Sequence, residues 1–432
     1  MPFEQTPVKQ KKIAVIGAGI SGLGAAYLLS DTHRVTLFEA EKRLGGHART
    51  VIAGKRGDQP VDTGFIVFNH VNYPHLSNLF RQLDVPVVKS NMSFGASFNG
   101  GALEYSLLGL DTLFAQRRNI LRPSYLRMMR DLFYFNANAE RMADDPSMTV
   151  RELLEKMGTG DWFRDYYLLP FSGAIWSTPR AQVLDFPAYG MVRFFKNHAL
   201  LNHTGQHQWY TVEGGSDQYV QRLAAAMTGN GVDIRLGAPI QAVQRNALGV
   251  TVKPWGAEAE AFDEVVFATH SDDALKMLVD AGSIERACLG EIAYQPNHVT
   301  LHRDPSVMPN RRKVWSSWCY TEPRGAKSDT IDLTYWMNSL QPIPHDDPHF
   351  VTLNDTGRIR EELIYDQVTM RHPVYGAGVL EAQDTLRAVN GTNRTWFCGA
   401  WMRHGFHEDG LASAAEVVEA MRHTTALAIA AE

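Results

Sequence analysis

Apolar runs and glycines alternate near the start of the chain in the order of a strand–helix–strand unit. Residues 12–16 (KIAVI) form a short β-branched run that is typical of a buried parallel strand. A glycine-rich turn follows, and leucines and alanines then recur at helical spacing from Leu23 to Leu29. A second apolar run, 34–38 (RVTLF), ends at Glu39. This order predicts an α/β fold built on a parallel sheet.

The turn after the first run has the spacing of a dinucleotide-binding loop. Gly17 permits a tight turn, Gly19 lets the backbone approach a pyrophosphate, and Gly22 allows the helix to pack closely on the strand. Glu39 ends the second strand, where a carboxylate binds ribose hydroxyls and disfavours a 2′-phosphate. A purely structural turn is the alternative, but strand, glycines, helix and acid together favour FAD or NAD. The predicted cofactor residues here are Gly17, Ala18, Gly19, Ile20, Ser21, Gly22 and Glu39.

Further along the chain, two kinds of segment alternate. Residues 78–208 are rich in aromatics and helix formers, and residues 276–387 contain many Trp, Tyr and Pro residues with predicted strands. Between and after them, the pattern predicts a helix over 217–227 and strands over 232–240, 264–269 and 396–399. A small and apolar run, 410–418, predicts a helix after the last strand.

Composition and charge exclude several function classes. The chain has 432 residues, 44% of them hydrophobic, and a net charge of −5, so no positive excess exists to bind nucleic acid. Its three cysteines form no C-x-x-C pair, which argues against a disulfide scaffold or a zinc site. We expect no metal. The polar N-terminal segment lacks the apolar stretch of a signal peptide, so we expect a cytoplasmic protein.

Two further motifs resemble the FAD signatures of the flavin-containing amine oxidase superfamily. The string 41–50 (EKRLGGHART) follows Glu39 at once, and 61–64 (VDTG) resembles the superfamily's loop beside the flavin ring. This pair distinguishes FAD from NAD. The resemblance implies a Rossmann-like FAD-binding domain of the glutathione-reductase/amine-oxidase type, with an α+β substrate domain inserted in two segments. The implied domains are 1–77, 209–275 and 388–432 for FAD, and 78–208 and 276–387 for substrate.

The same resemblance implies a further set of FAD contacts. The residue after Pro239 pairs its backbone with adenine, and 264–269 resembles the superfamily's "VVxAT" strand. The closing helix after Gly399 directs its N-terminal N–H groups, near Asp409, at the flavin. The implied FAD residues are Ala40, Arg43, Gly45, Gly46, His47, Thr63, Gly64, Phe65, Ile240, Ala268, Gly399, Asp409, Gly410 and Leu411.

A narrower resemblance involves 62–69 (DTGFIVFN), 170–177 (PFSGAIWS) and 405–410 (GFHEDG). These segments are similar to bacterial FAD proteins associated with cyclopropane fatty-acid synthase, and to the N-terminal part of plant cyclopropane fatty-acid synthases. The likeness implies oxidation or desaturation of a methylated, cyclopropane or unsaturated fatty-acyl chain. It also implies a cyclopropane fatty-acid synthase-like methyltransferase as functional partner. The alternatives are an amine oxidase that produces hydrogen peroxide and a non-catalytic flavoprotein partner of the synthase.

The substrate-side strand 296–302 (PNHVTLH) departs from the superfamily pattern. Amine oxidases usually place a lysine there, near the flavin, and this chain has Asn297 or His298 instead. The departure disfavours amine oxidation. No cysteine lies between Cys319 and Cys398, so the cysteine that bonds flavin in monoamine oxidases is missing and we expect non-covalent FAD. If the reaction needs a base, histidine suits neutral pH, and the candidates are His407 and His198.

Residues 108–135 mix leucines, phenylalanines and methionines with five arginines. A basic amphipathic helix of this kind docks on anionic lipids, which would place the protein peripherally on the inner membrane face. The alternative, which we favour, is a substrate-domain helix with a solvated arginine face. Pro123 limits any single helix in this segment.

Overall fold

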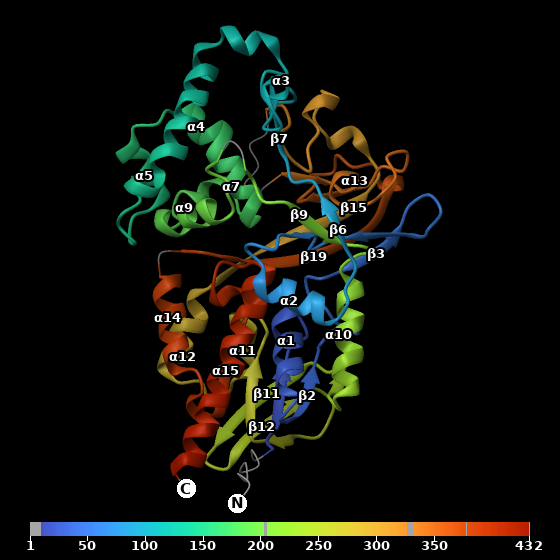
Figure 1. Ribbon diagram of the computed structural model, residues 1–432, viewed down its shortest axis with the longest axis vertical. Coiled ribbons are helices and arrows are strands. Elements are labelled where there is room, and N and C mark those ends of the chain that lie inside the picture. Colours follow the sequence, from blue (N-terminus) through green and yellow to red (C-terminus); the bar gives the residue numbers. More distant parts are fainter. Residues whose placement is uncertain (1–9, 203–204, 326–331, 377, 432) are drawn as a thin grey trace, which may run out of the picture.

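The computed structural model describes residues 10–202, 205–325, 332–376 and 378–431. The expectation of no signal peptide concerns mainly residues 1–9, which lie outside this range. Figure 1 shows two halves arranged along the long axis, one of them next to both chain termini. The half next to the termini contains a five-stranded sheet, and the other contains a seven-stranded sheet.

The five-stranded sheet is entirely parallel and joins segments from across the chain. Its order is β10 (Asp233–Arg235), β2 (Arg34–Phe38), β1 (Lys12–Ile16), β14 (Glu264–Phe267) and β20 (Thr395–Phe397). The central strand β1 is buried over almost its whole length, as its unbroken apolar run requires. The predicted α/β fold with a Rossmann-like sheet is confirmed.

Helices and a small sheet cover the two faces of this parallel sheet. On one face, α1 (Ile20–Leu29) packs with α10 (Asp217–Gly229) and α15 (His407–Ala431). The other face carries an antiparallel sheet of β11 (Ile240–Asn246), β12 (Gly249–Pro254) and β13 (Glu260–Phe262). The helices α11 (Ser271–Met277), α12 (Ser283–Glu291) and α14 (Val379–Val389) belong to this second core.

The seven-stranded sheet forms one wall of the other half. In spatial order its strands are β19 (Ile364–Val374), β15 (Ala293–His302), β18 (Phe350–Leu353), β17 (Leu333–Trp336), β16 (Trp318–Thr321), β7 (Phe94–Phe98) and β8 (Leu103–Ser106). A helical layer packs on it around one large core. Its longer helices are α4 (Pro123–Met142), α5 (Val150–Met157), α7 (Leu169–Trp176) and α9 (Ala188–Asn197). Short helices complete it: α3 (Leu110–Leu113), α6 (Asp161–Phe163), α8 (Arg180–Val183) and α13 (Met337–Leu340).

Two small sheets and one helix connect the halves. The pair β3 (Thr50–Ala53) and β4 (Gln59–Asp62) forms one sheet. The strands β5 (Val67–Phe68), β9 (Trp209–Val212) and β6 (Val87–Ser90) form the other, and α2 (Pro74–Gln82) follows β5. The chain therefore passes between the halves several times, as an inserted substrate domain requires.

The packing differs from the predicted domain boundaries at both ends of the second substrate segment. The whole of α12 and most of α14 fall within 276–387, yet Leu289 and Leu386 lie in the core that covers the parallel sheet. The two helices bury apolar faces against each other, and α12 also packs against α11, so both helices belong with the FAD-binding half. The seven-stranded sheet begins only at Ala293 within this segment.

The arginine-rich segment 108–135 is not one helix. A short α3 is followed by a 3-10 turn, Arg117–Leu121, and α4 then begins at Pro123. Proline is suited to this first position, because the N–H that it lacks would have no partner in the helix. Among the described helices, none combines the length and apolarity needed to cross a membrane.

Candidate functional site

A cavity of about 1500 Å³ lies where the two halves meet. From the parallel-sheet half, its wall includes Gly17–Ser21, Glu39 and Ala268. The other half contributes β19 residues and a set of aromatic side chains from α7 and α9. The carboxyl ends of β1, β2 and β14 therefore open into the cavity, where ligands bind in open α/β sheets.

The glycine loop after β1 has the backbone geometry that the sequence predicts. Gly17 has a φ of +97°, and a side chain there would come within 2.9 Å of the Ala268 carbonyl oxygen. A Cβ on Gly22 would lie 1.7 Å from the Gly17 carbonyl oxygen, so only glycine lets α1 start so close to β1. By contrast, a Cβ on Gly19 would meet nothing within 4 Å. Gly19 therefore faces open space in the cavity.

Glu39 and the second glycine loop complete this end of the cavity. The Glu39 carboxylate accepts hydrogen bonds from the N–H groups of Ala18, at 2.6 Å, and Glu41, at 2.8 Å. The Gly45 N–H donates to the Ala18 carbonyl at 2.8 Å, and Arg43 donates to the Gly46 carbonyl at 2.8 Å. The two loops therefore hold each other in place around the cavity.

The loop 64–65 lies against His47 and the closing helix. The Phe65 N–H donates to the His47 carbonyl at 2.8 Å, and a Cβ on Gly64 would be 1.9 Å from that oxygen. The Phe65 ring stacks on His407 with 3.9 Å between ring centroids. His407 Nε2 also lies 2.7 Å from the Tyr219 hydroxyl. Burial lowers the pKa of His407 to about 3, so its ring is neutral at physiological pH.

The predicted FAD contacts at Asp409, Gly410 and Leu411 do not lie on the cavity wall, which ends at His407 on this helix. The Asp409 carboxylate accepts from the Phe406 N–H at 2.9 Å and so closes the first turn of its own helix. A Cβ on Gly410 would meet Ser21 and Ile20, and Leu411 packs against Gly24. Gly410 and Leu411 therefore pack α15 against α1. The glycine that suggested a close approach of the backbone to the flavin instead lets the two helices lie close together.

Two other predicted contacts lie behind the wall. Gly22 faces the backbone of Gly17, and the Thr63 hydroxyl accepts from Arg49 at 3.1 Å. The remaining predicted FAD residues do line the cavity: Gly17, Ala18, Gly19, Ile20, Ser21, Glu39, Ala40, Arg43, Gly45, Gly46, His47, Gly64, Phe65, Ile240, Ala268 and Gly399. Their contact with a cofactor stays a prediction.

His198 ends α9 and lines the cavity from the other half. Its Nδ1 lies 3.0 Å from the Phe194 carbonyl oxygen, which can only accept, so Nδ1 is the protonated nitrogen. The ring stacks on Phe194 at 3.9 Å, and burial lowers the pKa of His198 to about 4. His198 and His407 are therefore both neutral members of aromatic clusters.

Strand β15, which has no lysine, instead carries a chain of side-chain amide hydrogen bonds that all run in one direction. The Asn354 side chain accepts from the His298 N–H at 3.0 Å, so its amide nitrogen is the group that donates to Asn297 Oδ1, at 2.8 Å. Asn297 then donates to His372 Nδ1 at 3.0 Å and to the Ser177 carbonyl at 3.1 Å. Asn297 itself is buried behind the cavity wall, whereas His372 lines it.

This chain determines the tautomer of His372. Because Nδ1 accepts from Asn297, the neutral ring keeps its proton on Nε2. Burial and the neighbouring rings of His47 and His270 lower the pKa of His372 to about 3, in agreement with a neutral ring. Sequence reasoning named Asn297 but missed His372, because their pairing depends on the register of β15 and β19.

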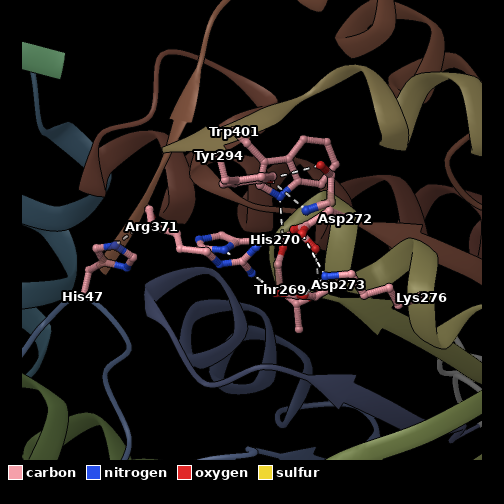
Figure 2. A network of polar contacts seen from close by, with 10 residues as sticks. His47, Thr269, His270, Asp272, Asp273, Lys276, Tyr294, Arg371 and Trp401 are labelled. Atoms are coloured by element: carbon pink, nitrogen blue, oxygen red, sulfur yellow. Dashed lines mark hydrogen bonds and ion pairs between the residues drawn. The ribbon is translucent and has the colours of Figure 1, made fainter. Parts of the chain in front are cut away.

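An ion-pair network lies beside these histidines (Figure 2). Arg371 pairs with Asp272 and Asp273 at the start of α11, and Lys276 reaches both carboxylates at 2.9 Å. His270 stacks on Tyr294 with centroids 4.3 Å apart. Donor atoms of His270, Asp272 and Asp273 lie close enough to share a metal ion, but Arg371 and Lys276 already neutralise both carboxylates.

The profile of the family described as "Flavin containing amine oxidoreductase" matches residues 20–294, well over half of the chain. The chain belongs to this family. The protein is therefore an FAD-dependent oxidoreductase, and its FAD is bound non-covalently, as is typical of the family.

Curated relatives match this chain over a short segment only. The L-amino-acid oxidase of Bothrops pauloensis is 50% identical over 48 residues, which are 11% of this chain and 10% of that protein. The L-amino acid oxidase Lm29 of Lachesis muta is 48% identical over the same length, 9% of that protein. The matches thus span about a tenth of the relatives.

Solved structures show the same fold over almost the whole chain. Cyclohexylamine oxidase from Brevibacterium oxydans has a TM-score of 0.70 and 17% identity, covering 96% of this chain and 100% of that one. A putative protoporphyrinogen oxidase from Exiguobacterium scores 0.69 at 18% identity and 96% and 99% coverage. A CLA-producing fatty acid isomerase from P. acnes scores 0.67 at 15% identity, covering 95% and 98%.

The residues that line the cavity fit FAD. Open space at Gly19 and the free N-terminus of α1 suit a pyrophosphate, and the Glu39 carboxylate lies where ribose hydroxyls bind. Arg43 adds a positive charge near the second glycine loop. Gly64, Phe65 and His407 provide a close backbone and flat rings for the flavin end.

Beyond the predicted FAD-binding residues, most side chains on the cavity wall are aromatic or aliphatic. The sequence motif 170–177 indicated part of this wall, but the contributions of α3, α4 and α9 depend on tertiary packing. The aromatic and aliphatic residues of this wall are Leu107, Leu108, Leu110, Leu113, Met129, Leu132, Phe133, Tyr167, Phe171, Ile175, Trp176, Phe194 and Trp209.

Proposed function

We propose that the protein oxidises or desaturates a fatty-acyl chain that is unsaturated, methylated or contains a cyclopropane ring. The many aromatic and aliphatic side chains that line the cavity as far as α3 and α4 are the observation that supports this proposal most strongly. A wall of this kind binds an extended hydrocarbon, since each buried methylene contributes about 0.8 kcal/mol. The fold is shared with a fatty acid isomerase, which also uses an acyl chain as substrate.

The chain's own residues would bind the substrate, exclude water and provide one hydrogen-bond donor. Bound FAD would supply an acceptor for a hydride from one substrate carbon, and the proton released from the adjacent carbon would go to the unprotonated Nε2 of His198 on the cavity wall. Trp176, Phe171 and Phe194 enclose the acyl chain and keep water from the reacting carbon. The neutral His372 ring presents the Nε2–H that Asn297 leaves free, and this donor holds a polar substrate atom or a flavin edge in place.

Amine oxidation is the second candidate function. The family name and the cyclohexylamine oxidase neighbour favour it. Against it, Lys276 is the one lysine on the described cavity wall, and Asp272 and Asp273 both bind its ammonium group. Strand β15 has no lysine, and Asn297 or His298 stands at the expected position.

A cyclopropane fatty-acid synthase-like methyltransferase is the proposed functional partner. The resemblance of the 62–69, 170–177 and 405–410 segments supports this pairing. Such an enzyme makes the methylated or cyclopropane chains that the cavity suits, so the two reactions would act in sequence. Deletion of each gene should change the same set of fatty acids, and unrelated lipid profiles would argue against a shared substrate.

Anaerobic mixing of the FAD-loaded protein with substrate panels tests the function directly. Detergent-dispersed fatty acids should bleach the flavin absorbance, with affinity rising about fourfold per added methylene until the wall is filled. Primary amines and polyamines serve as the comparison panel. Bleaching by amines alone would favour the second candidate and reject the first.

A further inference from the structure

Exposed apolar side chains gather on one segment of the surface. Of the seventeen large apolar residues exposed in the described part of the chain, eight lie between residues 107 and 134. Soluble proteins normally scatter such residues singly, so their concentration in one short segment makes this segment a candidate contact surface. The group consists of Leu107, Leu108, Leu110, Ile120, Leu121, Leu126, Phe133 and Tyr134, and we call it the α3–α4 patch.

The α3–α4 patch adjoins the substrate cavity. Leu107, Leu108, Leu110 and Phe133 are exposed to solvent and also line the cavity, so the cavity reaches the surface among them. Figure 1 shows α3 and α4 in the half of the molecule that points away from both termini. A ligand that enters here passes over apolar side chains from the surface inward.

Positive charge accompanies the patch. Residues 107–134 contain five arginines and two aspartates, a net charge of +3 in a chain whose total is −5. Asp131 is buried and binds Arg130 and the Gly160 N–H, so it contributes little negative surface. Asp111 pairs with Arg117. Apolar side chains flanked by arginines are the combination that binds the headgroup region of an anionic bilayer.

We propose that the α3–α4 patch docks on an anionic lipid bilayer and places the cavity opening against the membrane. An acyl chain then moves from the bilayer into the cavity without crossing water. The nature of this cargo rests on the proposed function, but the docking does not. The segment combines leucines of 76% and 86% exposure, Leu110 and Leu121, with a net positive charge, and both features match a lipid surface.

Vesicle flotation of the FAD-loaded protein tests the docking. The protein should float with phosphatidylglycerol–phosphatidylcholine vesicles, less with phosphatidylcholine alone, and less as salt is raised. Leu110→Asp/Leu121→Asp should weaken binding at least about tenfold, because two apolar contacts become like charges against the lipid. Arg117→Gln/Arg118→Gln should weaken it about fivefold per arginine.

Leu248→Asp is the matched control. Leu248 is 92% exposed in the turn between β11 and β12, in the half next to the termini, and the variant should float like the wild type. All variants must keep the wild-type melting temperature and flavin content. Equal flotation of the patch variants, an equal loss in the control, or no preference for anionic vesicles would overturn the proposal.

The assay separates docking from the proposed function. Flotation requires no turnover, whereas bleaching of the flavin by detergent-dispersed fatty acid requires no membrane. Bleaching without flotation therefore rejects the docking surface alone. Flotation without bleaching supports the docking surface and rejects the fatty-acyl function.

Discussion

At the scale of single residues, His407 has the position of a catalytic group but the protonation state of a structural one. Its ring stacks on Phe65 and forms a hydrogen bond with the Tyr219 hydroxyl. The ring is neutral, with a pKa of about 3. A group with this pKa does not change its charge between pH 5.5 and 8. Its contribution to the site is therefore a flat surface and a hydrogen bond.

His407→Gln should lower FAD affinity about tenfold, because it loses the ring contact and weakens the bond to Tyr219. The factor should be the same at pH 5.5 and pH 8. Fluorescence titration of the apoprotein with FAD at both pH values measures it. A loss confined to one side of pH 6.5 would show that His407 titrates and would contradict the buried neutral ring.

Asn297 should control the protonation of His372. In Asn297→Asp a carboxylate replaces the amide donor 3.0 Å from Nδ1, and an anion there favours the imidazolium. The pKa of His372 should rise from about 3 by about two units. Titration of nitrogen-15-labelled histidine measures the shift.

His298→Asn provides the control for this prediction. His298 lies on the same strand, with its ring 2.9 Å from the Thr369 hydroxyl and outside the cavity wall. The His372 titration should be unchanged in that variant. An unchanged titration in Asn297→Asp as well would mean that the amide chain does not determine the tautomer.

At the scale of elements, the first glycine loop contains glycines with two different roles: one allows helix packing and the other leaves space for the cofactor phosphates. Gly22 is required by packing, since any side chain would overlap the Gly17 carbonyl. Gly19 has free space and a φ of −71°, which alanine adopts without strain. The motif predicts both glycines, but only the structure shows which one the fold itself needs.

Gly19→Ala should therefore leave the apoprotein melting temperature unchanged and weaken FAD binding at least about tenfold, as the methyl group fills the phosphate space. Gly22→Ala should lower the melting temperature of the apoprotein itself, because α1 must shift. Thermal melts and FAD titrations of both variants decide the matter. Destabilised Gly19→Ala would show that this space belongs to the fold.

Glu408, on α15, caps the N-terminus of a different helix, α2. Its carboxylate accepts from the His75 and Leu76 N–H groups at 2.9 Å each and so closes the start of α2, although Glu408 itself lies on α15. Burial raises the pKa of Glu408 to about 7. A pKa above the unfolded value of about 4.5 means that this group's stabilisation is full below pH 4.5 and is lost as pH rises through 7.

Glu408→Gln should remove this dependence. The unfolding free energy of the wild type, relative to the variant, should fall by on the order of 2 kcal/mol between pH 4.5 and pH 8. Urea denaturation at both pH values measures the difference, and comparing the two proteins cancels other titrating groups. A constant difference would show that Glu408 keeps an ordinary pKa in the fold.

At the scale of the whole molecule, local patterns predicted the FAD-binding half better than the other. The runs 12–16 and 34–38 coincide with β1 and β2, because buried parallel strands and their glycine turns are encoded within a few residues. The amide chain to His372 and the separation of α12 and α14 from the substrate half depend on contacts between distant segments. No local pattern contains that information.

The position of the cavity between the halves predicts how FAD acts on stability. Glycine loops of one half and β19 residues of the other line the same space, so a ligand that fills it stabilises both. At a FAD concentration about 100 times Kd the gain is about 2.7 kcal/mol, or about 3 °C in melting temperature for a protein of this size. Hydrogen exchange should slow in β20 and in β17 together when FAD is added. Slowing confined to β20 would mean that the cofactor holds only the parallel-sheet half, and that the two halves respond to it independently.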